Sequence, residues 1–124
     1  MENKLGNVCI VDEHDEVRDG LCALLEAFGL SAHAHASPKD LLEEHNTHPR
    51  EDVVVLDLEM SEKNGAEVIK ILRDRGSEVP VILLTFDPDC FAARWSAKHG
   101  AVVLQKPLRS DAFIQTINSL LRAA

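Results

Sequence analysis

Residues 53–65 read VVVLDLEMSEKNG and begin with an uninterrupted apolar run, residues 53–56, which is followed by an acidic side chain, Asp57. Three further apolar runs have the same character: residues 8–11, 81–84 and 101–104. Short, continuous and largely β-branched runs are typical of strands that are buried on both faces, as in a parallel sheet covered by helices. A more polar run lies at about residues 30–36 and contains the stretch SAHAHA. Its alternation of small apolar and polar residues predicts an edge strand.

Segments with helical periodicity separate these runs. The first carries apolar residues at helical spacing: Val17, Leu21, Leu24, Leu25 and Phe28. The expected helices have recognisable ends: Gly29 stops the first, Ser37-Pro38 opens the second, the third ends near Gly76, the fourth runs from about Pro88 to His99, and Ser110 caps the last. The order is (βα)5, which predicts a doubly wound α/β fold with a five-stranded parallel sheet.

The composition is that of one globular domain, and we expect residues 1–124 to form it without a linker or repeat. Apolar residues make up 45% of the chain and charged residues 27%. Thirteen basic against twenty-one acidic side chains leave a net charge of −8, with no basic run. This balance argues against direct binding to nucleic acid or to an anionic membrane. Any effector domain would lie outside these residues.

Three cysteines, Cys9, Cys22 and Cys90, are widely spaced and form no CxxC pair. They predict buried thiols rather than a disulfide framework or a zinc site. The first residues lack a basic segment followed by an apolar stretch, and no apolar run approaches the length of a membrane span. These features predict a cytoplasmic protein.

Polar side chains follow the expected strands where ligands bind in an open parallel sheet, at the carboxyl ends. They are Asp12 and Glu13, Asp57, Thr85, and Lys106. Clustered carboxylates raise one another's pKa, so they call for a hard divalent cation such as Mg²⁺, to which Lys106 adds a fixed charge. The set suits a phosphoryl group, with Asp57 as the nucleophile and Thr85 as a hydrogen-bond donor. The acidic first loop argues against a nucleotide or flavin site.

Four segments in order, VCIVDEH (8–14), VVVLDLEMSEKNG (53–65), VILLT (81–85) and LQKP (104–107), resemble the receiver domain of two-component response regulators over nearly the whole chain. The resemblance implies a flavodoxin-like fold and transfer of a phosphoryl group to Asp57 from a sensor histidine kinase or a histidine phosphotransfer protein. It implies that Mg²⁺ is held by Asp12, Glu13, Asp57 and the backbone carbonyl of Glu59, and that Thr85 and Lys106 contact the phosphoryl oxygens.

The resemblance also implies a signalling switch that catalyses only its own phosphorylation and dephosphorylation, and is not a metabolic enzyme. The signal would pass through the face made by the fourth helix, the fifth strand and the fifth helix, which is also a candidate homodimer surface. Two alternatives remain: a pseudo-receiver that acts without phosphorylation, and a small phosphatase-like enzyme with an aspartyl-phosphate intermediate.

Three positions depart from the family's pattern. Ser61 replaces a proline, which predicts a more mobile acceptor loop. Phe86 replaces a small residue after the switch threonine, and we hypothesise that its ring narrows access to Asp57. Val103 stands where the switch aromatic is usual, so no ring rotation can report the phosphorylated state. Glu59 and Asp87 flank the expected path of an attacking water, which they would either repel or orient.

Overall fold

The computed structural model describes residues 6–47 and 51–123. Strands and helices alternate along this part of the chain as follows: β1 (Asn7–Val11), α1 (Asp15–Ala27), β2 (Ser31–His35), α2 (Pro38–Thr47), β3 (Val53–Asp57), α3 (Gly65–Asp74), β4 (Val81–Thr85), α4 (Phe91–Lys98), β5 (Ala101–Gln105) and α5 (Ser110–Ala123). The (βα)5 prediction is therefore confirmed. None of the helices in the described ranges is long and apolar enough to cross a membrane.

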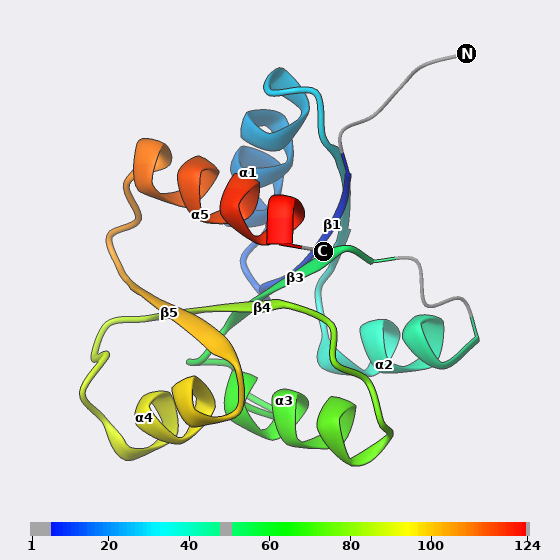
Figure 1. Ribbon diagram of the computed structural model, residues 1–124, viewed down its shortest axis with the longest axis vertical. Helices are drawn as coiled ribbons and strands as arrows, with labels where there is room; N and C mark the ends of the chain where they lie inside the picture. The colour runs from blue at the N-terminus through cyan, green and yellow to red at the C-terminus, as the bar shows by residue number, and fades with distance from the viewer. Residues whose placement is uncertain (1–5, 48–50, 124) are drawn as a thin grey trace.

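The five strands form one parallel sheet in the order β2-β1-β3-β4-β5. Helices α1 and α5 cover one face, and α2, α3 and α4 cover the other (Figure 1). The strand order reverses between β1 and β3, so the carboxyl ends of these two strands flank the crevice in which such sheets bind ligands. The register aligns Asp57 with Leu84 and Thr85 with Gln105, which brings the last residues of β3 and β4 to the same edge.

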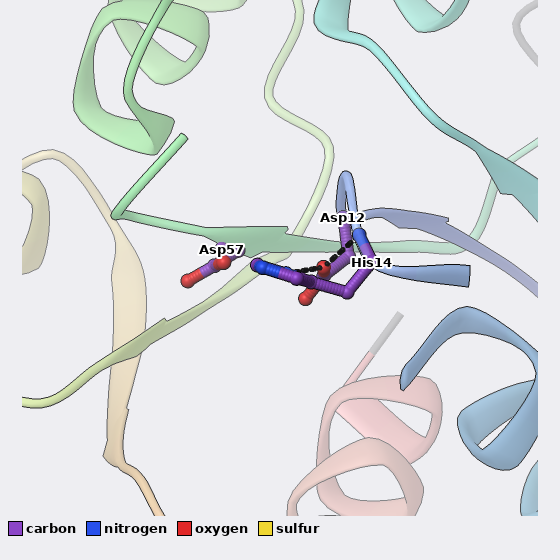
Figure 2. Close-up of side chains that lie close together, drawn as sticks. All are labelled: Asp12, His14 and Asp57. Carbon is purple, nitrogen blue, oxygen red and sulfur yellow. Dashed lines mark hydrogen bonds and ion pairs between the residues drawn. The ribbon is translucent and has the colours of Figure 1, made fainter. Parts of the chain in front are cut away.

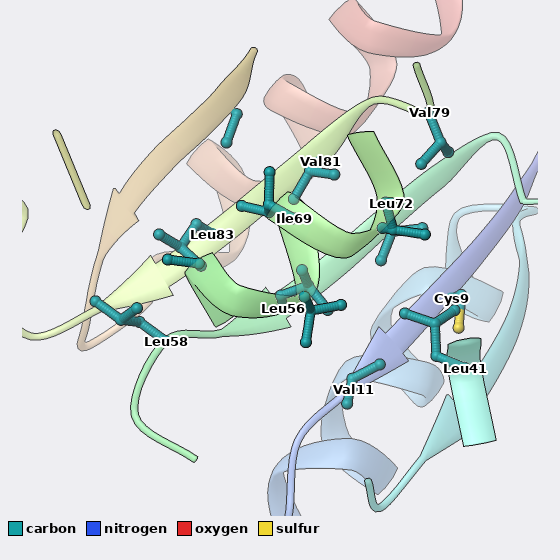
Figure 3. Close-up of a cluster of buried hydrophobic side chains, with 14 of the residues drawn as sticks. Cys9, Val11, Leu41, Leu56, Leu58, Ile69, Leu72, Val79, Val81 and Leu83 are labelled. Atoms are coloured by element: carbon teal, nitrogen blue, oxygen red, sulfur yellow. The ribbon is translucent and has the colours of Figure 1, made fainter. Parts of the chain in front are cut away.

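Strand β3 is buried along its whole length, and its residues serve the two faces in turn. Val54 and Leu56 pack with Ile69 and Leu72 of α3 in the core on the α2–α4 face (Figure 3). Val53 and Val55 belong to the opposite core, together with Phe113 of α5 and Leu25 of α1. Both faces of the strand therefore exclude water, which explains why the run is apolar at every position rather than at alternate ones.

Strand β2 lies at the sheet edge as predicted, with His33 and Ala34 exposed. The predicted start of the fourth helix was wrong. The fourth helix begins at Phe91, not near Pro88, because residues 87–90 form a turn and the Sγ of Cys90 accepts a hydrogen bond from the backbone of Ala93.

Two apolar residues of the first helical segment and two of the cysteines are more exposed than their pattern suggested. Val17 and Phe28 are 42% and 53% exposed. Cys9 is fully buried, but Cys22 and Cys90 are only half-buried. Periodicity identified the helix without fixing how much of its apolar stripe the sheet covers.

Gly65, the first residue of α3, packs directly against the strand that carries Asp57. A Cβ at this position would lie 2.5 Å from the Cδ1 of Leu83 and 2.9 Å from the carbonyl oxygen of Asp57. Gly65 also donates its N–H to the carbonyl of Leu58. Only glycine allows α3 to begin this close to the end of β3.

We expect Gly65→Ala to lower the free energy of unfolding by about 1–3 kcal/mol, the usual cost of overpacking. Gly20→Ala is the matched control, because nothing lies within 4 Å of a Cβ at Gly20, an exposed position inside α1. It should raise stability by roughly 0.5–1 kcal/mol, since alanine loses less entropy in a helix. Urea unfolding measures both, and a Gly65→Ala protein as stable as the parent would contradict the close approach.

Candidate functional site

The strand ends place the predicted polar residues together at the carboxyl edge of the sheet. The N–H of Leu58 donates to the carbonyl of Leu84, and the N–H of Lys106 donates to the carbonyl of Thr85, each at 2.8 Å. These bonds continue the β3–β4 and β4–β5 ladders one residue beyond the strands. They hold the backbone of the three loops in register, so Asp57, Thr85 and Lys106 lie at the same edge of the sheet.

Asp57 is nearly fully buried, with 2% of its surface exposed, and it is paired with a cation. The Nζ of Lys106 lies 2.6 Å from its Oδ1, which also accepts the backbone N–H of Glu59 at 3.3 Å. Burial raises the pKa of Asp57 above its usual value, and the contact with Lys106 only partly offsets this. Burial acts to lower the pKa of Lys106, but the bonds to Asp57 and Glu59 outweigh it and the pKa is raised.

Asp12 lies beside Asp57 and is 4% exposed. Its Oδ1 accepts the backbone N–H of His14 at 2.8 Å and lies 2.9 Å from the Nδ1 of the same residue. Ligand atoms of Asp12, His14 and Asp57 all lie within 4.8 Å of one another, with the imidazole next to both carboxylates (Figure 2). Two buried carboxylates this close together fit a hard divalent cation. The sequence pattern does not single out His14, although this residue directly follows the acidic pair.

Glu13 does not join this cluster. Its side chain is exposed, and its carboxylate accepts the N–H of Ser61 at 3.0 Å and the hydroxyl of Ser61 at 2.8 Å. The two hydrogen bonds lower the pKa of Glu13, the backbone bond being the larger cause. The expectation that Ser61 loosens the acceptor loop overlooked them: serine supplies two donors that a proline lacks, and both tie this loop to the loop after β1.

Glu59 joins two of the predicted site residues, Thr85 and Lys106. One carboxylate oxygen accepts the hydroxyl of Thr85 at 2.6 Å, and the other lies 3.0 Å from the Nζ of Lys106 and 3.4 Å from the backbone nitrogen of Phe86. Burial acts to raise the pKa of Glu59, but the bonds from Thr85 and Lys106 outweigh it, so the pKa is lowered. The sequence placed Glu59 beside the site and did not show that its side chain takes both predicted phosphoryl contacts.

Asp87 and Phe86 complete the surroundings of Thr85. The backbone N–H of Asp87 donates to the Thr85 hydroxyl oxygen at 3.1 Å, while the Asp87 carboxylate accepts the N–H of Asp89. Phe86 is 65% exposed, and the Nζ of Lys106 lies 4.3 Å from its ring centroid. This distance is short enough for a cation–π contact, so the ring covers the lysine rather than standing free.

Residues 8–118 match the family described as the response regulator receiver domain. The chain belongs to this family. It is 34% identical to the transcriptional regulatory protein TdiR of Thauera aromatica, over 95% of this chain and 53% of that protein. It is 33% identical to the transcriptional regulatory protein FixJ of Azorhizobium caulinodans, over 92% of this chain and 54% of that protein. The chain thus spans about half the length of these relatives.

Solved structures agree with this assignment. The receiver domain of Francisella response regulator 1452 superposes with a TM-score of 0.86 at 27% identity, covering 95% of this chain and 98% of that one. A response regulator receiver protein from Burkholderia phymatum gives 0.80 at 32% identity, with 94% of each chain covered. The flavodoxin-like receiver fold is therefore confirmed, and the chain is a receiver domain of two-component signalling, a signalling protein rather than a conventional enzyme.

The Glu13–Ser61 contact can be tested by titration. Ser61→Ala removes the hydroxyl and keeps the backbone N–H, whereas Ser61→Pro removes both. We expect the pKa of Glu13 to rise toward its ordinary value in Ser61→Ala and further in Ser61→Pro, as followed by NMR of the Glu13 carboxyl carbon in metal-free buffer. The contact should stabilise the folded protein fully when the pH is above the ordinary pKa of a glutamate. This contribution should disappear as the pH falls through the lowered pKa that Glu13 has in the folded protein.

Ser119→Ala, at an exposed serine of α5, is the matched control and should leave the titration of Glu13 unchanged. An unchanged pKa of Glu13 in Ser61→Pro would show that the contact is not formed in solution.

Proposed function

We propose that Asp57 is the phosphoryl acceptor of this receiver domain. The observation that carries the proposal is the pairing of the Asp57 carboxylate, which is 2% exposed, with Lys106. Asp57 ends the central strand β3, and Thr85 ends the neighbouring strand β4. A carboxylate held in this way is aimed by its surroundings and shielded from bulk water. It is suited to attack a phosphorus atom presented at the open edge of the sheet.

We further propose that a divalent cation, Mg²⁺ in the cell, is held by the carboxylates of Asp12 and Asp57 and the backbone carbonyl of Glu59. Glu13 would join these ligands only after its carboxylate leaves Ser61. Asp12 and Asp57 support this role because both are buried and an oxygen of each lies within 4.8 Å of the other. When bound, the cation supplies positive charge against a phosphoryl oxygen. The nitrogen of His14 lies within reach of the same point.

In the proposed transfer, an oxygen of Asp57 attacks the phosphorus of a phosphohistidine. A P–O bond forms, the P–N bond breaks, and the histidine ring leaves with the electron pair and takes up a proton. Lys106 and the hydroxyl of Thr85 then hold phosphoryl oxygens, which places the new negative charge against existing donors. In hydrolysis, a water oxygen attacks the phosphorus of phosphorylated Asp57. A P–O bond to water forms, the P–O bond to Asp57 breaks, and Asp57 leaves as a carboxylate while the water gives up a proton to solvent.

The donor in this proposal is a sensor histidine kinase or a histidine phosphotransfer protein, encountered in the cytoplasm. Residues 1–124 act as one receiver domain, and phosphorylation shifts the population toward a form that signals through α4, β5 and α5, the face that is also the candidate homodimer surface. The net charge of −8 supports an output that reaches nucleic acid through a partner or another domain.

The experiment that tests the acceptor is mass spectrometry of the intact protein after incubation with Mg²⁺ and acetyl phosphate, and with a panel of histidine kinases. The parent should gain a single phosphoryl group, and Asp57→Ala should gain none. Asp19→Asn, which changes an exposed aspartate of α1, is the matched control and should be phosphorylated like the parent. If no donor phosphorylates the parent, the pseudo-receiver becomes the better description.

Phe86→Ala tests the ring that covers Lys106. We expect dephosphorylation and phosphorylation by acetyl phosphate both to become faster by a few-fold, because removing the ring widens the approach to Asp57 and uncovers the Lys106 ammonium. Phosphate release and intact mass against time measure the two rates. Phe91→Ala, which removes an 84% exposed ring at the start of α4, serves as the control. Unchanged rates in Phe86→Ala would rule out the shielding role.

A further inference from the structure

The carboxylate of Glu59 is bonded to the same two groups that the proposed mechanism assigns to the phosphoryl oxygens. The hydroxyl of Thr85 donates to it at 2.6 Å, and the Nζ of Lys106 lies 3.0 Å from it. Glu59 comes from the loop after β3, whereas Thr85 and Lys106 come from the ends of β4 and β5. A single side chain thus joins the carboxyl ends of three neighbouring strands.

We propose that Glu59 is an internal latch, whose carboxylate holds Thr85 and Lys106 in the unphosphorylated domain and must release Thr85 before a phosphoryl group can be bound there. The inference rests on the proposed function, because it takes Asp57 as the acceptor. It assigns Glu59 a positioning role that acts through Thr85 and Lys106, separate from any ligand role of its backbone carbonyl.

The carboxylate of Glu59 and a phosphoryl oxygen would compete for the same donors, and the number of hydrogens on each donor decides the outcome. A threonine hydroxyl carries one hydrogen, so Thr85 can donate to Glu59 or to a phosphoryl oxygen but not to both. Its oxygen already accepts the N–H of Asp87 at 3.1 Å, which leaves the O–H aimed at Glu59. Lys106 carries three hydrogens and can keep Asp57 and Glu59 while gaining a third partner. Thr85 is therefore the contact that has to change.

Charge works in the same direction. A phosphoryl group on Asp57 carries a charge of about −1.5 to −2 near neutral pH. It would lie next to the carboxylate of Glu59, since both side chains contact the same Nζ of Lys106. Two neighbouring anions repel each other, and the phosphoryl group is a stronger acceptor than Glu59 for the hydrogens of Thr85 and Lys106. Phosphorylation thus favours the released position of Glu59.

Release of Thr85 by Glu59 would also change a contact in the loop between β4 and α4. The carboxylate of Glu59 accepts the backbone N–H of Phe86, the residue that opens this loop, at 3.4 Å. The ring of Phe86 in turn lies over Lys106. Movement of Glu59 therefore acts on the first residue of the loop that leads to α4. The proposed latch thus links Asp57 to this loop without an aromatic side chain at Val103.

Glu59→Gln tests the latch, because it keeps the shape of the side chain and its backbone carbonyl but removes the charge. We expect the rate of phosphorylation by acetyl phosphate to rise by about tenfold, the usual effect of weakening one hydrogen bond to a charged group. Glu62→Gln, at an exposed position of the same loop, removes the same charge and should leave the rate unchanged. Equal acceleration by both variants would show that the loss of any negative charge from this loop speeds phosphorylation, and it would overturn the latch.

A second measurement needs no phosphorylation. Three-bond NMR couplings report the χ1 rotamer of Thr85, which should be single in the parent and in Glu62→Gln but averaged in Glu59→Ala. A fixed Thr85 rotamer in Glu59→Ala would overturn the latch even if phosphorylation proceeds normally. If neither the parent nor Glu59→Gln gains a phosphoryl group while the Thr85 rotamer is released as expected, the latch stands as a structural contact and the proposed acceptor role fails.

Discussion

The ion pair between Asp57 and Lys106 is the interaction on which the site depends. Burying a carboxylate is costly unless a cation and hydrogen bonds accompany it, and Asp57 is 2% exposed. The cation arrives from β5, two strands away, at 2.6 Å. The pair can form only if β3, β4 and β5 keep their register, and that register is fixed by apolar runs whose faces both pack against helices. The core and the site are therefore specified together.

The sequence predicted the parts of the site that sit on strands better than those in loops. Strand length and register follow from burial on both faces, so the positions of Asp57, Thr85 and Lys106 could be inferred from where each apolar run stops. The directions of loop side chains follow from tertiary contacts instead. Glu13 turns to Ser61 rather than to Asp57, and no local pattern foretells this, because the two residues lie 48 positions apart.

The departures from the family's pattern are compensated locally. Ser61 lacks the fixed φ of proline, yet its two donors bind Glu13 and join two loops. Phe86 is larger than the usual residue, and its ring finds a partner in Lys106. The sequence predicts a loss at Ser61 and an obstruction at Phe86, and the structure shows that each side chain also gains a contact. Substitutions at a site such as this one are best judged by the partners they acquire.

The charges around Asp57 constrain how the domain can respond to phosphorylation. Asp12, Asp57 and Glu59 bring three carboxylates to the described site, and the ammonium of Lys106 contacts two of them, Asp57 and Glu59. A phosphoryl group adds further negative charge at the same point. A bound divalent cation offsets part of this excess, and outward movement of an anion relieves more. Asp12 is buried and Asp57 is the proposed acceptor, so the exposed side chain of Glu59, which shares the single hydroxyl hydrogen of Thr85, is the anion that can move outward.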